Sequence, residues 1–418
     1  MRTHRSDNTS KSKKRPQKTD FLLGKVRQYN SPRKIWKRSK LWQKIVEVLV
    51  VIILVALGTM YGIAKWYMAQ QSSKPLTLGV TFIADYAQQL GTNPHQSLDA
   101  MIYGLGVRNF RFVSYWNDIE LKPGVYNFSE LDWEFGQADA SHSTVSLSIG
   151  LRQPRWPECH APSWAASEPE SVWYPQLTQF ITTVVNRYKN NPALVSYQLE
   201  NEYFLKAFGQ CTNYSRSRLV NEYNLVKKLD PNHTLIVSRS NNALGVPVGQ
   251  PQPDEFGVSV YKRVWDATIT HRYFEYPFPA WFYGFLAGAD EIATGKNTII
   301  HELQAEPWPP DGQEIQNVSI AEQNKSMDAT ILKSRIRYGE ATGIRTIYFW
   351  GAEWWYYRLV DEHDASVWNV AKQAFTQAQA TNAQLTLQKL QSSRHSGVSM
   401  LFNKDRQVED FSKGLDMT

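Results

Sequence analysis

Short apolar runs with the composition of β-strands alternate with longer helical segments from residue 76 to residue 384, and this alternation restricts the possible folds most strongly. Eight such runs occur: Thr77–Ile83, Asn109–Tyr115, Thr144–Gly150, Leu194–Glu200, Thr234–Arg239, Phe256–Val260, Thr298–Glu302 and Thr346–Gly351. The helical segments between them include Ser97–Leu105, Tyr174–Tyr188, Arg216–Lys228, Ile320–Tyr338 and Ser366–Ala380. Strands that alternate with helices favour an α/β fold, and eight repeats over about 310 residues predict a (β/α)8 TIM barrel.

A doubly wound open sheet is the alternative α/β fold. Its dinucleotide-binding members carry a G-x-G-x-x-G turn after the first strand, and no such turn follows residues 77–83 here. We therefore expect one barrel domain over residues 72–384. From residue 385 to residue 418 the chain is polar, which predicts a tail or a loosely packed extension.

The first 44 residues are strongly basic. They hold 15 Lys or Arg against Asp7 and Asp20, a net charge of +13, and they lack periodic apolar residues. This composition predicts a disordered tail. Because the whole chain carries a net charge of +7, the remainder is mildly acidic at −6. The positive charge therefore belongs to the tail, and we expect no nucleic-acid partner.

An apolar stretch, Ile45–Ala64, follows the tail directly, and Glu47 is its one charged residue. At about 1.5 Å rise per residue, a helix of this length spans the roughly 30 Å hydrocarbon core of a bilayer. Basic residues precede the stretch, and aromatic residues suited to a membrane interface flank it: Lys37, Arg38, Lys40 and Lys44, with Trp42, Trp66 and Tyr67.

The positive charge before the stretch predicts that residues 1–44 form a cytoplasmic tail and that the chain after Lys65 is extracellular. We expect residues 45–67 to form an uncleaved signal-anchor helix that crosses the cell membrane once and contacts the lipid bilayer. A cleaved signal peptide is the main alternative, although its apolar part normally has about 7–15 residues. A buried core helix is a second alternative, less consistent with the absence of a polar face.

Polar and aromatic side chains gather where the predicted strands end. In a (β/α)8 barrel the C-terminal strand ends meet at one face, and this face carries the chemistry. The residues concerned are Arg111 and Trp116 on the second run, Glu200, Asn201 and Glu202 on the fourth, Tyr261 on the sixth, His301, Glu302 and Glu306 on the seventh, and Trp350, Glu353, Trp354 and Trp355 on the eighth. We therefore expect carboxylates, an amide, an arginine and aromatic rings around one mouth of the barrel.

Two of these segments resemble the ones that carry the catalytic residues of clan A glycoside hydrolases. The run Asn191-Pro-Ala-Leu-Val-Ser-Tyr-Gln-Leu-Glu-Asn-Glu202-Tyr is similar to their fourth-strand segment, whose Asn-Glu pair holds the acid/base. The run Ile299-Ile-His-Glu302-Leu-Gln-Ala-Glu-Pro-Trp308 is similar to their seventh-strand segment, which holds the nucleophile. The resemblance extends to Arg111, to residues 116–132 and to Trp350, and it is nearest to cellulase-like and β-galactosidase-like members.

The resemblance implies a retaining β-glycosidase that hydrolyses O-glycosidic bonds by double displacement. This chemistry needs two carboxyls about 5–5.5 Å apart, one protonated and one ionised. In this interpretation Glu202 is the general acid/base, with its pKa raised by the charge of Glu302, and Glu302 is the nucleophile. Arg111 and Tyr261 would hydrogen-bond Glu302 and keep it ionised, and Asn201 would donate to the sugar 2-hydroxyl.

Each carboxylate assignment has a competitor. Glu200 lies near the same strand end as Glu202, and strand alternation points both side chains the same way. Glu306 competes with Glu302, although its place four residues further on suits a sugar subsite or a contact to a loop. Glu353 is interpreted as a loop or subsite residue.

The supporting residues also have plainer interpretations. Arg111 could pair with a structural carboxylate, and Tyr261 could be a packing residue. His301 is expected to point to the side of its strand opposite Glu302 and to pack in the core. The resemblance implies that Trp350 forms the floor of the subsite for the reacting sugar. Some of the other tryptophans near strand ends are expected to stack on sugar rings as well: Trp116, Trp156, Trp308, Trp354 and Trp355.

The two cysteines of the chain, Cys159 and Cys211, follow the third and fourth strands in loops above the same face. Outside the membrane an oxidising environment favours a disulfide that ties these neighbouring loops together. Two free buried thiols are the alternative. We expect no metal and no cofactor, since Cys159 and His160 lack further ligands at a metal-binding spacing.

The sequence thus predicts a membrane-anchored glycoside hydrolase that acts on an extracellular oligo- or polysaccharide. A different class is a barrel that has lost turnover and serves as a carbohydrate-binding protein, because a fold does not determine an activity. A transglycosylase, which passes the sugar from Glu302 to another sugar, uses the same residues. Competition between water and sugar acceptors distinguishes it from a hydrolase.

Overall fold

The computed structural model describes residues 40–206, 208–211, 214–240 and 249–413, and gives backbone alone from residue 392 onward. The predicted basic tail lies outside the described residues up to position 39. The chain divides into two compact units, residues 1–59 and residues 60–418, which are described separately.

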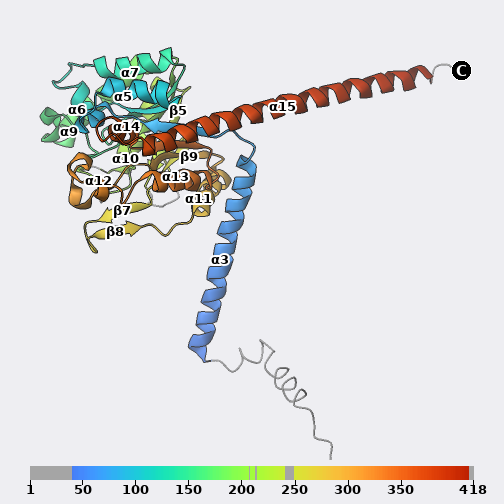
Figure 1. Cartoon of the computed structure of the whole chain (residues 1–418), viewed down its shortest axis with the longest axis horizontal. Helices are drawn as coiled ribbons and strands as arrows, with labels where there is room; N and C mark the ends of the chain where they lie inside the picture. Colours follow the sequence, from blue (N-terminus) through green and yellow to red (C-terminus); the bar gives the residue numbers. More distant parts are fainter. Residues whose placement is uncertain (1–39, 207, 212–213, 241–248, 414–418) are drawn as a thin grey trace, which may run out of the picture. The chain divides into compact units, whose positions relative to one another are not determined.

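Residues 60–418 contain a closed barrel of eight parallel strands (Figure 1). The strands are β1 (Thr77–Thr81), β2 (Asn109–Val113), β3 (Thr144–Ile149), β4 (Leu194–Leu199), β5 (Thr234–Arg239), β6 (Glu255–Val260), β9 (Asn297–Gln304) and β10 (Thr346–Trp350). They follow one another around the barrel in chain order, and β1 pairs with β10 to close it. Each strand falls on one of the eight predicted runs, so the (β/α)8 TIM barrel is confirmed.

Helices connect the strands and cover the outside of the barrel. They are α4 (Ala84–Gln89), α5 (Pro94–Asp99), the π-helical η1 (Ala100–Leu105), α6 (Trp116–Ile119), α7 (Ser129–Ala140), α8 (Ser163–Ala166), α9 (Glu170–Tyr188), α10 (Arg216–Leu229), α11 (Ala280–Thr294), α12 (Ile320–Gln323), α13 (Ala329–Glu340), α14 (Ala352–Val360) and α15 (Ser366–Lys413). Short 3-10 turns, η2 (Pro310–Gly312) and η3 (Ile315–Asn317), follow β9.

Two details of this helical layer differ from the sequence prediction. The predicted helix Ile320–Tyr338 is interrupted, because the Asp328 side chain accepts the Ile331 N–H at 2.7 Å and starts a new helix there. An antiparallel hairpin, β7 (Arg263–Asp266) and β8 (Arg272–Glu275), was not predicted. It follows β6 and so belongs to the loops at the C-terminal strand ends.

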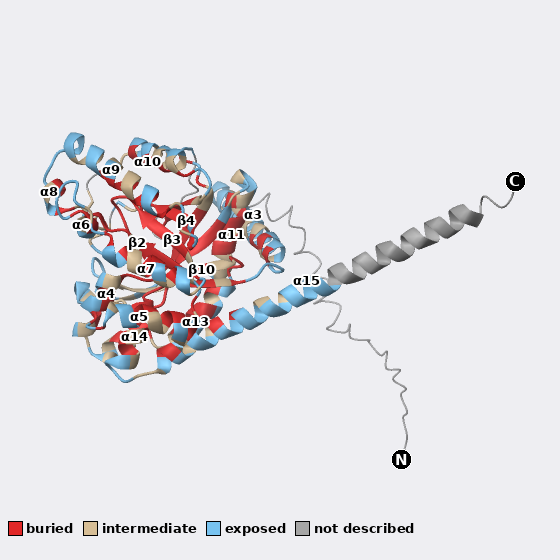
Figure 2. Ribbon diagram, turned by 90° about the horizontal axis from the view of Figure 1, so that it is seen from above, coloured by how far each residue is buried: buried red, intermediate tan, exposed pale blue. Residues whose placement is uncertain are grey.

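Alternate residues along a barrel strand face the surrounding helices and the barrel interior. On β2, Phe110 and Phe112 are fully buried, and Phe112 packs on Phe135 of α7 with ring centroids 6.0 Å apart. Arg111 lies between them and points into the barrel instead. Figure 2 shows the barrel strands buried and the helices around them carrying exposed residues.

The apolar stretch near the N-terminus forms helix α3 (Leu41–Gln71). Among the described residues it is the one helix long and apolar enough to cross a membrane, judged by length and composition. Its last part, from residue 60, belongs to the barrel unit. There Ala64 and Tyr67 are fully buried, and Gly288 of α11 lets the two helices approach closely, since a β-carbon on it would lie 3.0 Å from Tyr67.

The polar C-terminal segment continues a helix. Helix α15 runs without a break from the barrel through residue 413. Its first turns pack on the barrel, where Trp368 and Phe375 are buried. The polar extension expected from residue 385 therefore has a helical backbone as far as the structure describes it.

Candidate active site

Glu200 and Glu202 follow β4 on a turn that separates their side chains. Both residues adopt left-handed backbone conformations, with φ of +53° and +41°. Such values are uncommon outside glycine, and they end the alternation that the strand would otherwise impose. The expectation that the two carboxylates point the same way is therefore wrong, and each one has its own surroundings.

Glu200 is part of a buried ion-pair network. Its carboxylate accepts the N–H groups of Leu151 at 2.7 Å and Arg152 at 3.0 Å, and it pairs with Arg218 at 3.1 Å. Arg218 also pairs with Glu222 at 2.7 Å. Every oxygen of Glu200 is thus engaged in joining β4 to the preceding loop and to α10, which is a structural role.

Glu202 instead faces Glu302 across the barrel mouth. One carboxylate oxygen of each lies within 4.8 Å of the other. The Ser259 hydroxyl on β6 donates to Glu202 and lies 3.5 Å from the second oxygen of Glu302. Both glutamates are buried, with exposed fractions of 5% and 3%. This short separation is compatible with the carboxyl pair of retaining glycosidases, about 5–5.5 Å apart, and is shorter than the roughly 6.5–9.5 Å of inverting ones.

The surroundings of Glu302 favour its ionised form. Arg111 donates to one oxygen at 2.8 Å, and the Tyr261 hydroxyl donates to the other at 2.7 Å. Burial alone would raise the pKa of Glu302, but the charge of Arg111 and the hydrogen bonds from Arg111 and Tyr261 together hold it below its usual value. A buried carboxylate with two donors is also fixed in orientation.

The surroundings of Glu202 favour its protonated form. Burial raises its pKa to about 7, and the nearby charge of Glu302 contributes to the increase. Below about pH 7 the two glutamates therefore favour different protonation states, with Glu202 protonated and Glu302 ionised. This is the division between an acid and a nucleophile that double displacement requires.

Asn201 lies beside both carboxylates with its amide held in one orientation. Its side-chain oxygen accepts from Arg111 at 3.0 Å and from Gln198 at 2.9 Å. Its amide nitrogen donates to Glu158 at 3.2 Å. The Arg111 guanidinium therefore connects Glu302 and Asn201, and the two residues occupy fixed positions relative to each other.

His301 does not follow the sequence expectation. The pairing of β9 with its neighbours shifts register at this position, since Val258 pairs with Ile300 and Ser259 with Glu302. The extra residue is a β-bulge, which turns His301 to the same side as Glu302. Its Nε2 atom lies 3.7 Å from Glu302 and 3.3 Å from Ser259. Burial lowers the pKa of His301 to about 3, so the ring is neutral.

Glu202, His301 and Glu302 are the one trio of potential metal ligands close enough together to bind a cation jointly among the described residues. The hydrogen bonds that Glu302 already accepts argue against cation binding by this trio. Arg111 and Tyr261 already bond to the two oxygens of Glu302, and a guanidinium at 2.8 Å competes with any cation.

Glu306 and Glu353 lie at the same mouth and bond to other parts of the chain. Glu306 accepts the Tyr86 hydroxyl at 2.7 Å and pairs with Arg155 at 3.0 Å, so it bridges to the loop after β3. Glu353 accepts the Ile83 N–H at 2.7 Å, and burial raises its pKa to about 7.

Trp350 ends β10 and is 6% exposed. The Arg155 guanidinium lies over its ring, 4.5 Å from the centroid. The Trp350 ring, which was expected to form the floor of a sugar subsite, is therefore in contact with the Arg155 side chain from the loop after β3. A ligand that stacks on the same ring face must share it with Arg155 or displace it.

The other tryptophans fall into two groups. Trp116, Trp354 and Trp355 are fully buried, and their indole N–H groups donate to Glu120, Gln323 and the Ala305 carbonyl respectively. These three support the fold and present no ring face to a ligand. Trp156 and Trp308 are accessible, and Trp308 packs edge-on against Tyr261 at 5.5 Å.

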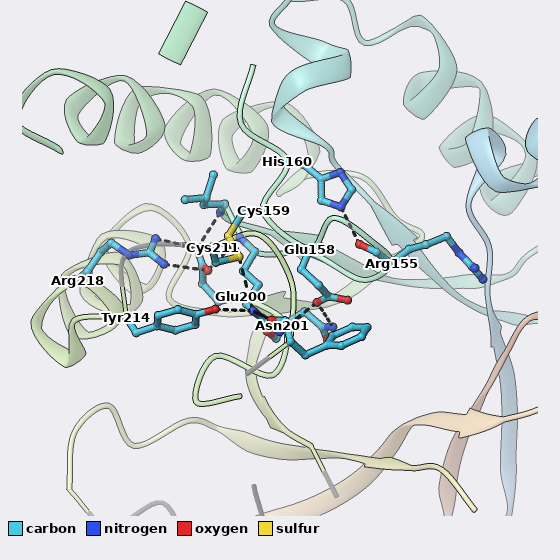
Figure 3. Close-up of a disulfide and its surroundings, with 12 residues drawn as sticks. Arg155, Glu158, Cys159, His160, Glu200, Asn201, Cys211, Tyr214 and Arg218 are labelled. Carbon is cyan, nitrogen blue, oxygen red and sulfur yellow. Dashed lines mark hydrogen bonds and ion pairs between the residues drawn. A yellow bond between two sulfur atoms is a disulfide. The ribbon is translucent and has the colours of Figure 1, made fainter. Parts of the chain in front are cut away.

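Cys159 and Cys211 form a disulfide between the loops after β3 and β4, as Figure 3 shows. Arg152 lies beneath it, donating from Nε to the Asn201 carbonyl at 2.6 Å and from another nitrogen to the Tyr214 hydroxyl at 3.1 Å. The disulfide therefore joins the two loops directly above the backbone of the Asn201–Glu202 turn.

The sequence analysis missed several residues that contact this site. Ser259 could have been found, since it lies two positions before Tyr261 on β6 and faces the same side. Glu158, Arg152 and Arg155 belong to an irregular loop, where no period predicts direction.

No model of a protein family matches the chain, and no curated protein matches it. Solved structures do show similarity. An exo-β-1,4-mannosidase from Opitutaceae bacterium strain TAV5 is 15% identical with a TM-score of 0.43, over 66% of this chain and 52% of its own. An endo-β-1,4-xylanase of glycoside hydrolase family 10 from Gloeophyllum trabeum is 14% identical with a TM-score of 0.47, over 72% and 97%.

Endo-glycoceramidase II from Rhodococcus sp. is also similar, at 14% identity and a TM-score of 0.42, over 66% of this chain and 73% of its own. This chain thus spans about half the length of the mannosidase and most of the length of the other two. At such identities the likeness concerns the barrel fold alone.

Proposed function

We propose that the protein is a retaining β-glycosidase, with Glu202 as general acid/base and Glu302 as nucleophile. The observation that carries the proposal is the buried glutamate pair, with carboxylate oxygens within 4.8 Å and opposite pKa shifts. Two carboxyls that served only to stabilise the fold would not need opposite pKa shifts.

In the first step the ionised Glu302 attacks the anomeric carbon of the sugar while Glu202 donates its proton to the glycosidic oxygen. The bond to the leaving group breaks, and an ester between the sugar and Glu302 forms. As the charge on Glu302 is lost to the ester, the pKa of Glu202 falls, which prepares it to act as a base.

In the second step Glu202 accepts a proton from water, and the water oxygen attacks the same carbon. The ester bond to Glu302 breaks, and the sugar leaves with its original anomeric configuration. In this mechanism Asn201 donates to the 2-hydroxyl of the reacting sugar, a contact that strengthens in the transition state. Arg111 and Tyr261 hold Glu302 in its ionised form and in position throughout.

We further propose that residues 45–67 anchor the enzyme in the cell membrane, with the barrel extracellular and an oligo- or polysaccharide as substrate. The support is helix α3, whose apolar residues 45–55 are largely exposed to their surroundings. The 15 basic residues before position 45 favour a cytoplasmic N-terminus.

The stereochemistry of the product tests the reaction class. Full-length protein in detergent is mixed with a panel of aryl β-glycosides, and proton NMR follows the anomer that forms first. Early appearance of the β-anomer, absent with Glu302→Gln, supports the proposal. Early appearance of the α-anomer would show an inverting reaction, and carbohydrate binding without hydrolysis across the panel would show a non-catalytic barrel.

A further inference from the structure

A third buried carboxyl lies beside the glutamate pair. Glu158, in the loop after β3, is 3% exposed, and its Oε2 atom lies 3.2 Å from the amide nitrogen of Asn201. A guanidinium nitrogen of Arg152 lies 3.5 Å from the same oxygen. In Figure 3 the Glu158 side chain points toward Asn201, and the disulfide is drawn beside it.

The backbone around Glu158 holds it in this position. Glu158 has a φ of +70°, and the next residue, Cys159, forms the disulfide with Cys211. Gly209 packs directly on the Glu158 side chain, because a β-carbon on that glycine would lie 2.7 Å from the Glu158 Cβ. Two loops therefore enclose Glu158, and the disulfide fixes them to each other.

The hydrogen bonds of Asn201 show what Glu158 contributes. The amide oxygen of Asn201 accepts from Arg111 and Gln198, so the amide nitrogen must point away from both. That nitrogen has two hydrogens, and the Glu158 contact accounts for one of them. Because the amide group is planar, the second hydrogen of the Asn201 nitrogen then has a fixed direction.

We propose that Glu158 is a positioning residue of the same site. By accepting one amide hydrogen of Asn201, it directs the other toward the 2-hydroxyl of the reacting sugar. This inference rests on the proposed function, because the 2-hydroxyl contact matters only in glycoside cleavage. Glu158 touches neither the anomeric carbon nor the leaving oxygen and acts through Asn201.

Glu158 needs only an acceptor oxygen for this role. Burial raises the pKa of Glu158 well above its usual value, the negative charge of Glu302 adds to the effect, and the charge of Arg152 opposes it. Glutamine keeps the shape of this side chain and an acceptor oxygen. Methionine fills the same volume without an acceptor.

The test compares matched substrates and matched variants. An aryl β-glycoside that wild type cleaves is compared with its 2-deoxy analogue. The measured quantity is the kcat/KM for the 2-hydroxy substrate divided by the kcat/KM for the 2-deoxy analogue. Loss of one buried hydrogen bond corresponds to about a tenfold change. We expect Glu158→Met to lower the ratio about tenfold and Glu158→Gln to leave it within about threefold.

Two further variants separate positioning from general damage. Asn201→Ala should lower the ratio at least as much as Glu158→Met, and the double variant no further than Asn201→Ala alone. His160→Ala is the loop control: His160 bonds the Arg155 carbonyl in the same loop and stacks on Tyr115. It should slow both substrates equally and leave the ratio unchanged.

The inference is overturned if Glu158→Met slows both substrates by the same factor or neither of them. It is also overturned if Glu158→Gln lowers the ratio as much as Glu158→Met does. If Glu158→Met fails to fold, Glu158→Ala replaces it in the same comparison. If wild type cleaves no member of the aryl β-glycoside panel, the proposed function itself is refuted, and this inference with it.

Discussion

Replacing Tyr261 with phenylalanine removes one hydroxyl from the nucleophile and leaves the ring in place. That hydroxyl donates to Glu302 Oε2 at 2.7 Å, while Arg111 holds the other oxygen. The ring packs edge-on against Trp308, and phenylalanine keeps this contact. The substitution therefore tests one hydrogen bond to the carboxylate with little change in packing.

The size of the effect follows from the kind of bond. A hydrogen bond to a charged group contributes about 1.5–3 kcal/mol, and about 1.4 kcal/mol corresponds to one pH unit in a titration. Because the bond stabilises the ionised form of Glu302, its loss raises the pKa of that carboxyl. We expect the acid limb of the kcat/KM profile to move upward by about one pH unit or more.

The assay is kcat/KM against pH for wild type, Tyr261→Phe and a matched control, Tyr197→Phe. Tyr197 on β4 also donates to a carboxylate, Asp230 at 3.1 Å, outside the site. Loss of the Tyr197 hydroxyl should lower the stability of the protein and leave the acid and basic limbs of the kcat/KM profile in place. An acid limb that stays in place with Tyr261→Phe, or moves equally with Tyr197→Phe, would refute the role given to Tyr261.

Three other predictions concern the acid, the disulfide and the buried ion pairs. Above pH 7, kcat/KM should fall about tenfold per pH unit, because Glu202 must be protonated to donate and its pKa is about 7; a flat profile from pH 7 to pH 9 would contradict this. Replacing Cys159 and Cys211 with serine should lower the free energy of unfolding by about 4 kcal/mol, because the disulfide closes a loop with a sequence separation of 52 residues. Denaturant titration of the variant and of wild type measures this difference. Arg218→Met should cost about 3–5 kcal/mol by the same measurement, since it leaves two buried carboxylates unpaired; a loss below about 1 kcal/mol would argue against an ionised network there.

The barrel could be predicted because its strands are short apolar runs with a clear period. All eight predicted runs overlap a barrel strand, and Arg111 lies on β2 as the period-two pattern requires. The helix from Ile320 was predicted without a break, since Asp328 acts as a cap only through its own backbone geometry.

The pattern failed where the backbone leaves regular geometry. Glu200 and Glu202 separate because both have positive φ, and His301 turns inward because of a β-bulge. Neither feature can be read from residue types, since glutamate and histidine rarely adopt these conformations. Such irregularities are common at functional sites, where side chains from neighbouring positions must converge.

The third feature beyond prediction is the loop after β3. Arg155 and Glu158 reach the site from a segment without strand or helix period, and both have positive φ. Their directions depend on the disulfide and on contacts with Glu306 and Asn201, which join parts of the chain far apart in sequence.

Covalent trapping of Glu302 tests the central claim most directly. Full-length protein is incubated with 2-deoxy-2-fluoro β-glycosides bearing good leaving groups, and the intact mass and labelled peptide are determined. We expect a gain of one glycosyl unit on the peptide that contains Glu302, and no gain with Glu302→Gln. A label on Glu306 would contradict the choice of nucleophile, and oligosaccharide binding without labelling by any panel member would contradict a retaining glycosidase.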